Sequence, residues 1–167
     1  MPTQTNEQAL EAAIEKKLTG SCLEELKQQG DVQERAEVYR SGNGYYMGYA
    51  NDFNTKYAID EVRFWHFLAT TQVEELAKIQ KQNDWKLKIL DRLDRMIKKY
   101  GVVKLLRKGL DVDDAHFTLF YVLPLASSSQ SVKDNFDNNE FSVTRQLRYS
   151  LTNPREEIDM VLFINGL

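Results

Sequence analysis

The segment Ile158-Asp159-Met160-Val161-Leu162-Phe163-Ile164-Asn165-Gly166-Leu167 decides the class of fold that the sequence predicts. Residues 158–164 predict a β-strand, because all of them except Asp159 are apolar and most are types that strands favour. Even-numbered side chains of this strand share one face, and odd-numbered side chains share the other. Asn165-Gly166 is the strongest short signal for a hairpin turn, since both central residues of such a turn need positive φ. We therefore expect a sheet whose next strand lies beyond Leu167.

Two more strands are predicted before this segment. Residues 117–123 form a continuous apolar run that ends at Pro124, as expected of a buried strand. Apolar and polar residues alternate over 141–149, which is typical of a half-buried strand. The residues between these strands, 127–138, are polar and predict a loop. Strands therefore dominate residues 111–167.

Helices are predicted for most of residues 1–110, where apolar side chains recur every three or four positions. Gly101 and Gly109 are expected to end two of these helices. Residues 31–56 predict irregular structure. The chain is thus expected to form one α/β domain over residues 1–167, mainly helical in 1–110 and mainly stranded in 111–167. The expected helices are 6–18, a short one near 23–26, 60–81, 85–100 and 102–108.

The amino-acid composition indicates a soluble globular protein and excludes several kinds of site. The hydrophobic fraction of 42%, the charged fraction of 28% and the net charge of −3 are those of a soluble globular protein. The single cysteine, Cys22, excludes an internal disulfide and a cysteine-based zinc site. No apolar run is long enough to cross a membrane, and the first residues do not resemble a secretory signal. We expect a cytoplasmic protein without a membrane partner.

Carboxylates are the first candidate functional groups. Asp159 stands near the start of an apolar strand, an arrangement found in nucleases that hold Mg²⁺. Glu7 and Glu11 are four residues apart, so they share a helix face and one of them could complete a metal shell. The alternative is that Asp159 is a solvated carboxylate and that the glutamates form a solvated stripe, which Glu15 on the same face would extend.

Basic residues are the second candidate group. Residues 86–108 contain nine basic and two acidic residues, a net charge of +7 in a chain of net charge −3. Such asymmetry indicates contact with a phosphate backbone, although the solvated face of an amphipathic helix is the alternative. Arg145 and Arg148 are expected on opposite faces of their strand, where one could contact a phosphate or pair with a carboxylate. The candidate DNA-binding residues are Lys98, Lys99, Lys104, Arg107, Lys108, Arg145 and Arg148.

The sequence gives little support for a histidine-dependent nucleophile or for a glycine-rich phosphate-binding loop. His66 and His116 are expected to be structural, and no Ser-His-Asp or Cys-His arrangement is evident. The glycines at 42, 44 and 48 do not match a phosphate-binding loop.

The C-terminal part of the sequence resembles a known family. Phe141-Ser-Val-Thr-Arg-Gln-Leu-Arg-Tyr149, Asn153-Pro154 and the segment 158–167 are similar to the N-terminal part of the R subunit (HsdR) of type I restriction–modification enzymes. The upstream stretches 60–68, 92–97 and 109–117 also resemble sequences of this family. The resemblance therefore covers nearly the whole chain.

The resemblance implies a PD-(D/E)xK nuclease, with a restriction-endonuclease-like mixed sheet flanked by helices. It assigns the strand carboxylate that binds Mg²⁺ to Asp159, and the helical carboxylate to Glu11 in preference to Glu7. The family's Glu-x-Lys pair on the next strand has no counterpart here, so we expect a fold truncated before the last catalytic strand. The ATP-driven translocase domains of the family are also expected to be absent.

Two functions follow as expectations. In the first, the chain is a nuclease-domain fragment of an R subunit, inactive alone. The full-length, ATP-dependent subunit would cut double-stranded DNA in a complex with methyltransferase and specificity subunits. In the second, the chain is a non-catalytic module that docks on DNA or on the methyltransferase through residues 86–108 and the aromatic cluster between Tyr45 and Phe53.

Overall fold

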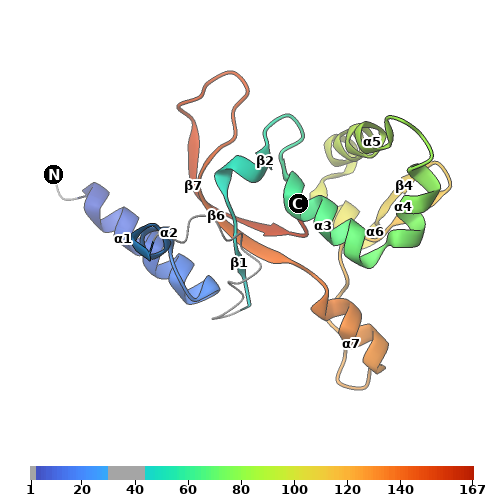
Figure 1. Cartoon of the computed structure of the whole chain (residues 1–167), viewed down its shortest axis with the longest axis horizontal. Helices are drawn as coiled ribbons and strands as arrows, with labels where there is room; N and C mark the ends of the chain where they lie inside the picture. The colour runs from blue at the N-terminus through green and yellow to red at the C-terminus, as the bar shows by residue number, and fades with distance from the viewer. Residues whose placement is uncertain (1–2, 30–43) are drawn as a thin grey trace. The chain divides into compact units, whose positions relative to one another are not determined.

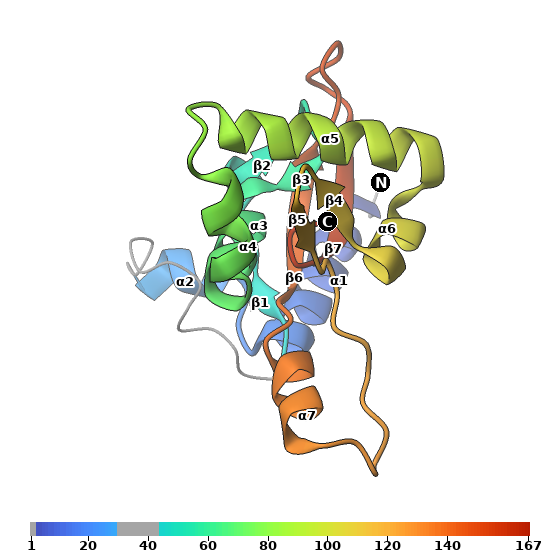
Figure 2. The same ribbon diagram turned by 90° about the vertical axis from the view of Figure 1, so that its right-hand side faces the viewer.

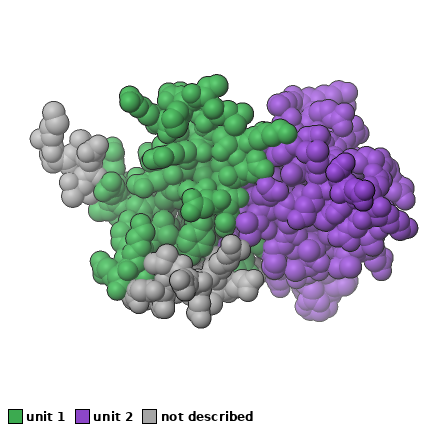
Figure 3. Space-filling view, turned by 45° about the horizontal axis from the view of Figure 1, so that its top comes forward, with its two compact units in different colours: residues 1–56, 140–163 green, residues 57–139, 164–167 purple. Residues whose placement is uncertain are grey.

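The computed structural model describes residues 3–29 and 44–167, which form two compact units. Figure 3 colours the first unit, residues 1–56 and 140–163, and the second unit, residues 57–139 and 164–167. Residues 30–43, where much of the predicted irregular segment falls, lie outside the described residues. Whether residues 1–167 act as a single domain stays a prediction.

The first unit is built on a three-stranded sheet in the order β1-β6-β7 (Figure 1). β1 runs parallel to β6, with Tyr46 opposite Ser142 and Met47 opposite Val143, and residues 149–156 connect β6 to β7 as a hairpin. Helix α1 packs against both β1 and β6. The elements of this unit are α1 (Thr3–Thr19), α2 (Leu23–Gln29), β1 (Tyr46–Met47), a 3₁₀ helix η2 (Ala50–Asp52), β2 (Phe53–Asn54), β6 (Phe141–Arg148) and most of β7 (Glu157–Ile164).

This sheet confirms the predicted fold class and both C-terminal strands. The β1–β6 pair is parallel and the β6–β7 pair is a hairpin, so the sheet is mixed, with helices beside it. The predicted strand 141–149 is β6 and the predicted strand 158–164 is β7, each within one residue. Apolar side chains from all three strands are buried here, and they include Met47, Val143, Leu147 and Phe163.

The second unit is mainly helical. Helix α5 packs against β4 and helix α4 packs against β5 of a short antiparallel ribbon, and Figure 2 shows α5 running across β4. Complete burial of aromatic side chains such as Phe64, Phe67 and Phe117 stabilises this core by about 1.5–3 kcal/mol each. The elements are β3 (Ile59–Asp60), α3 (Glu61–Thr71), α4 (Val73–Ile79), α5 (Trp85–Tyr100), α6 (Val102–Lys108), β4 (Leu110–Val112), β5 (Ala115–Phe117) and α7 (Gln130–Asp137).

The helix predicted for residues 60–81 is divided into α3 and α4 at Gln72. The backbone of Gln72 leaves the helical region, with φ −139° and ψ 45°. Its side-chain amide donates to the carbonyl oxygen of Thr118 at 2.7 Å, and its Oε1 accepts from the Thr118 N–H at 2.6 Å. The prediction of one helix was therefore wrong, because a contact 46 residues away along the chain favours a non-helical Gln72.

The predicted strand 117–123 is a strand only in its first residue, which ends β5. The segment that follows is held by side-chain amides instead of by a neighbouring strand. Gln72 binds both backbone groups of Thr118, and Asn139 binds both backbone groups of Tyr121, at 3.0 and 2.7 Å. The Asn165 amide donates to the Leu119 carbonyl at 2.9 Å. These amides satisfy the polar backbone groups that a sheet would otherwise pair.

The predicted loop 127–138 contains helix α7, which is a further correction. Most of its exposed side chains are polar, although Val132 is exposed too, and Gln130 donates to Asp134 one turn later at 2.7 Å. Val132 and Phe136 are four residues apart and so share a face of the helix. The helix was not predicted because most residues of this segment are polar and only these two apolar residues have helical spacing.

The turn predicted at Asn165-Gly166 is confirmed. Both residues have positive φ, 54° and 84°, and Ile164 and Leu167 exchange two backbone hydrogen bonds of 3.0 Å. The carbonyl oxygen of Gly166 also accepts from the Asp60 N–H at 2.9 Å. The turn is therefore anchored to the start of α3.

Candidate functional site

Arg145 is the centre of a charged cluster in the first unit. Its guanidinium contacts the carboxylates of Glu11 at 3.2 Å, Glu15 at 3.2 Å and Glu24 at 2.9 Å. The Arg145 side chain is only 3% exposed and that of Glu15 is fully buried. The cluster therefore joins α1, α2 and β6 through one cation.

Local structure explains why these groups meet. Glu11 and Glu15 are four residues apart on α1, so their carboxylates lie on the same face of the helix. Arg145 is buried on β6, whereas Arg148 is exposed, and their placement on opposite faces of the strand stays a prediction. The interpretation of Glu15 as part of a solvated stripe was wrong, since this face of α1 is covered by β6. The four-residue spacing was visible in the sequence, but the buried cation that it faces was not.

The cluster has three carboxylates and one guanidinium, and its burial and hydrogen bonds shift the pKa values of Glu15 and Arg145. Burial raises the pKa of Glu15, and its hydrogen bonds from the Leu23 N–H and Arg145 only partly oppose the change. Glu15 Oε2 accepts both of these bonds, whereas Oε1 is buried and has no partner among the described residues. Burial acts to lower the pKa of Arg145, but hydrogen bonds to Glu15, Glu24 and Glu11 outweigh it and raise that pKa. Arg145 therefore stays charged, whereas burial disfavours the ionised form of Glu15.

A pH-dependent stability follows from Glu15. Its raised pKa means that the folded chain binds this proton more tightly than the unfolded chain does. The resulting stabilisation is present below the ordinary value of 4.5 and is lost as the pH rises through the raised pKa. The glutamine side chain in the variant Glu15→Gln has no titratable proton. As the pH rises from 4.5 through the raised pKa, the unfolding free energy of the variant should therefore increase relative to that of the wild type. Urea unfolding at a series of pH values measures this difference.

Glu7→Gln is the matched control, because Glu7 is an exposed carboxylate on the same helix. A difference between Glu15→Gln and wild type that stays constant with pH would contradict the prediction.

The structure places the three carboxylates predicted for the metal site in different surroundings. Asp159 lies on β7, the strand next to β6, and its side chain faces solvent in the described structure. Glu7 is exposed on α1, whereas Glu11 is only 14% exposed and contacts Arg145. Within residues 3–29 and 44–167, no three histidine, cysteine, aspartate or glutamate side chains are grouped so that they could hold a metal ion. The catalytic roles of Asp159, Glu11 and Glu7 stay predictions.

The predicted basic surface lies on α5 and α6 in the second unit. Its five lysine and arginine side chains are all exposed, namely Lys98, Lys99, Lys104, Arg107 and Lys108. The ammonium groups of Lys99 and Lys104 lie 5.0 and 4.2 Å from the centre of the Tyr100 ring. A hydrogen bond to Lys99 and the charge of Lys104 lower the pKa of the Tyr100 hydroxyl. This surface is therefore strongly cationic, with an aromatic ring at its centre.

Comparison with known proteins now decides the family. The model of the family described as the type I restriction enzyme R protein N terminus matches residues 4–167. The chain belongs to this family. Neither a curated protein nor a solved structure matches the chain significantly.

Membership in the R protein N-terminal family confirms the resemblance seen in the sequence. The match includes the Arg145 cluster, β7 with Asp159, and the basic surface on α5 and α6. The chain is therefore the N-terminal region of a restriction endonuclease subunit, part of a restriction complex that acts on DNA. No helix in the described part of this R protein region combines the length and hydropathy needed to cross a bilayer.

Proposed function

We propose that this chain is the nuclease region of an R subunit, with Asp159 and Glu11 as the carboxylates of an Mg²⁺ site. The order of strands is the observation that supports this. β7 carries Asp159, its neighbour β6 carries Arg145, and Arg145 contacts Glu11 on α1. Neighbouring strands are about 4.8 Å apart, so the backbone that carries Asp159 lies next to the strand whose Arg145 contacts Glu11. In this proposal Arg145 is a positioning residue that holds Glu11 on the sheet.

We also propose that the chain does not cleave DNA alone. Asp159 and Glu11 would supply two carboxylates to the ion, and the described residues group no third histidine, cysteine, aspartate or glutamate with them. Cleavage would then belong to the full-length subunit, which uses ATP and assembles with the methyltransferase and specificity subunits. The nuclease would be of the PD-(D/E)xK type, and its compartment would be the cytoplasm.

The test uses supercoiled plasmid, Mg²⁺ and two proteins. The chain alone should leave the plasmid intact, whereas the full-length subunit in its complex should cut it when ATP is added. Asp159→Ala in the full-length subunit should abolish cutting and leave ATP hydrolysis unchanged. Asp114→Ala is the matched control, because Asp114 is an exposed aspartate in the other unit.

Two results would contradict these proposals. Cutting by the isolated chain would refute its inactivity, and cutting by the full-length Asp159→Ala subunit would refute the role of Asp159.

For the basic surface we propose contact with the DNA backbone. Lys98, Lys99, Lys104, Arg107 and Lys108 are exposed and lie on consecutive helices, and Arg148 on β6 is 72% exposed. Phosphate contacts need such accessible cations. Arg145 differs, because its guanidinium is enclosed by three carboxylates.

Docking on the methyltransferase is the alternative role for the same surface. The exposed lysine and arginine side chains of this surface could pair with acidic side chains of a protein partner as well as with phosphates. Assembly with the methyltransferase, measured without DNA, separates the two roles.

A further inference from the structure

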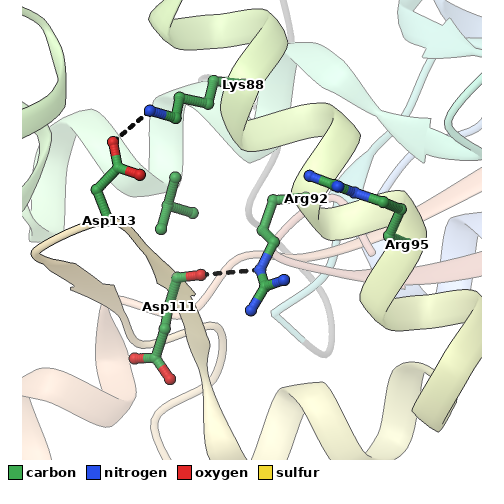
Figure 4. A pocket seen from close by; sticks show the side chains of 6 residues that line it. Lys88, Arg92, Arg95, Asp111 and Asp113 are labelled. Atoms are coloured by element: carbon green, nitrogen blue, oxygen red, sulfur yellow. Dashed lines mark hydrogen bonds and ion pairs between the residues drawn. The ribbon is translucent and has the colours of Figure 1, made fainter.

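A charged pocket lies between α5 and β4 in the second unit, apart from the residues assigned above. Its volume is about 330 Å³, and Figure 4 shows its side chains projecting from the helix and from the facing strand. The lining consists of Lys88, Arg92, Arg95, Asp111, Val112 and Asp113.

The basic residues of the pocket share one face of α5. Lys88, Arg92 and Arg95 are spaced by four and three positions, so they line up along the helix. This face precedes Lys98 and Lys99 on the same helix, so the pocket adjoins the basic surface in sequence.

The two acidic residues of the pocket already have partners. Asp113 accepts hydrogen bonds from Lys88 and from the Gln82 amide, the second at 3.1 Å. Asp111 Oδ1 lies 2.6 Å from His116 Nδ1. Hydrogen bonds from Lys88 and Gln82 lower the pKa of Asp113, so its charge is well compensated. The Asp113 carboxylate is therefore directed to Lys88 and Gln82 and the Asp111 carboxylate to His116, and neither pairs with the arginines in the described part of the chain.

The two arginines are oriented but not neutralised. Arg92 Nε donates to the carbonyl oxygen of Asp111 at 3.2 Å, and Arg95 Nε donates to the carbonyl oxygen of Asp91 at 3.2 Å. Each bond uses one of the five N–H donors of a guanidinium, and the Nη groups make no hydrogen bond within the described residues. A guanidinium with its Nη donors available is suited to bidentate binding of a phosphate.

We propose that this pocket binds one phosphate group of the DNA backbone through the Nη atoms of Arg92 and Arg95. Duplex DNA is favoured over a free nucleotide because the lining has no aromatic residue, and Val112 is its only apolar one. A nucleotide base would find no stacking surface there, whereas a backbone phosphate needs none. This inference rests on the proposed contact between the basic surface and DNA, which it extends to a defined phosphate site.

The test compares two double variants of the 167-residue chain. Arg92→Gln with Arg95→Gln removes both guanidinium groups, and Lys27→Gln with Arg155→Gln removes the same charge from exposed positions in the other unit. Binding of a fluorescent 20-base-pair duplex is measured by anisotropy at several salt concentrations, and circular dichroism checks folding. Binding of ATP and of inorganic phosphate is measured separately.

The expected result is specific to the pocket variant. Its affinity for the duplex should fall about tenfold, as for the loss of one charge-assisted contact. The slope of log K against log salt should become shallower by about 1, since one phosphate contact is lost. The control variant should keep the slope of the wild type.

Three results would overturn the inference. If the wild type binds the duplex and the pocket variant is indistinguishable from the control, the pocket is not a DNA contact and the wider basic surface stands. If only ATP binding falls in the pocket variant, the site takes a nucleotide. If the wild type binds no duplex, the proposed DNA surface fails and this extension of it fails too.

Discussion

Arg145→Ala should lower the unfolding free energy by about 3–5 kcal/mol, the range for removing one partner of a buried ion pair. The substitution leaves three carboxylates beside one another, and the buried one, Glu15, loses the cation that it contacts among the described residues. It also removes the group that joins α1 and α2 to β6. Urea unfolding at neutral pH, followed by circular dichroism, measures the loss.

Arg148→Ala is the matched control on the same strand. Arg148 lies 3.5 Å from Glu157 and is 72% exposed, so its removal should cost no more than about 1 kcal/mol. Adding Glu15→Gln to Arg145→Ala should recover part of the loss, because glutamine keeps an acceptor for the Leu23 N–H and carries no charge. Equal costs for Arg145→Ala and Arg148→Ala would refute the structural role of the cluster.

Gly166→Ala should also be strongly destabilising, for two separable reasons. The φ of 84° lies in the left-handed region, which costs a residue with Cβ about 1–2 kcal/mol. The added Cβ would lie 2.5 Å from the Asp60 carbonyl oxygen and 2.7 Å from the Phe64 nitrogen. Backbone atoms cannot rotate away, so crowding should add about 1–3 kcal/mol. Thermal and urea unfolding give the total.

Gly101→Ala separates the two reasons. Gly101 has a similar φ of 81°, but a Cβ there would meet nothing within 4 Å. Its ψ of 153° adds to the preference for glycine, so the cost of Gly101→Ala should be the conformational part alone, about 1–3 kcal/mol. If the two alanine variants lose the same stability, the turn is not packed tightly against α3.

Local signals in the sequence predicted several elements well. Asn165-Gly166 and Gly101 take positive φ because their chemistry permits it, whatever surrounds them. The strands at 141–148 and 157–164 follow from strand-favouring composition over eight residues. The fold class followed from the same features.

Non-local contacts explain the errors. A helix across Gln72 and a strand across Leu119 were both reasonable on local preference. The amides of Gln72, Asn139 and Asn165 instead bind the backbone of residues 118–121. No pattern in a single sequence pairs an amide with a carbonyl 46 residues away.

The sequence likewise predicted part of the candidate site, and tertiary structure decided the rest. Asp159 near the head of an apolar strand, the glutamates spaced by four, and the +7 segment could be read from residue types and spacing alone, because periodicity assigns side chains to faces. Tertiary structure decided that Arg145 is enclosed by Glu11, Glu15 and Glu24, and that Arg92 and Arg95 line a pocket. The physical reason is burial. The energy of a charge depends on how much water and which opposite charges surround it, and only the folded chain sets both.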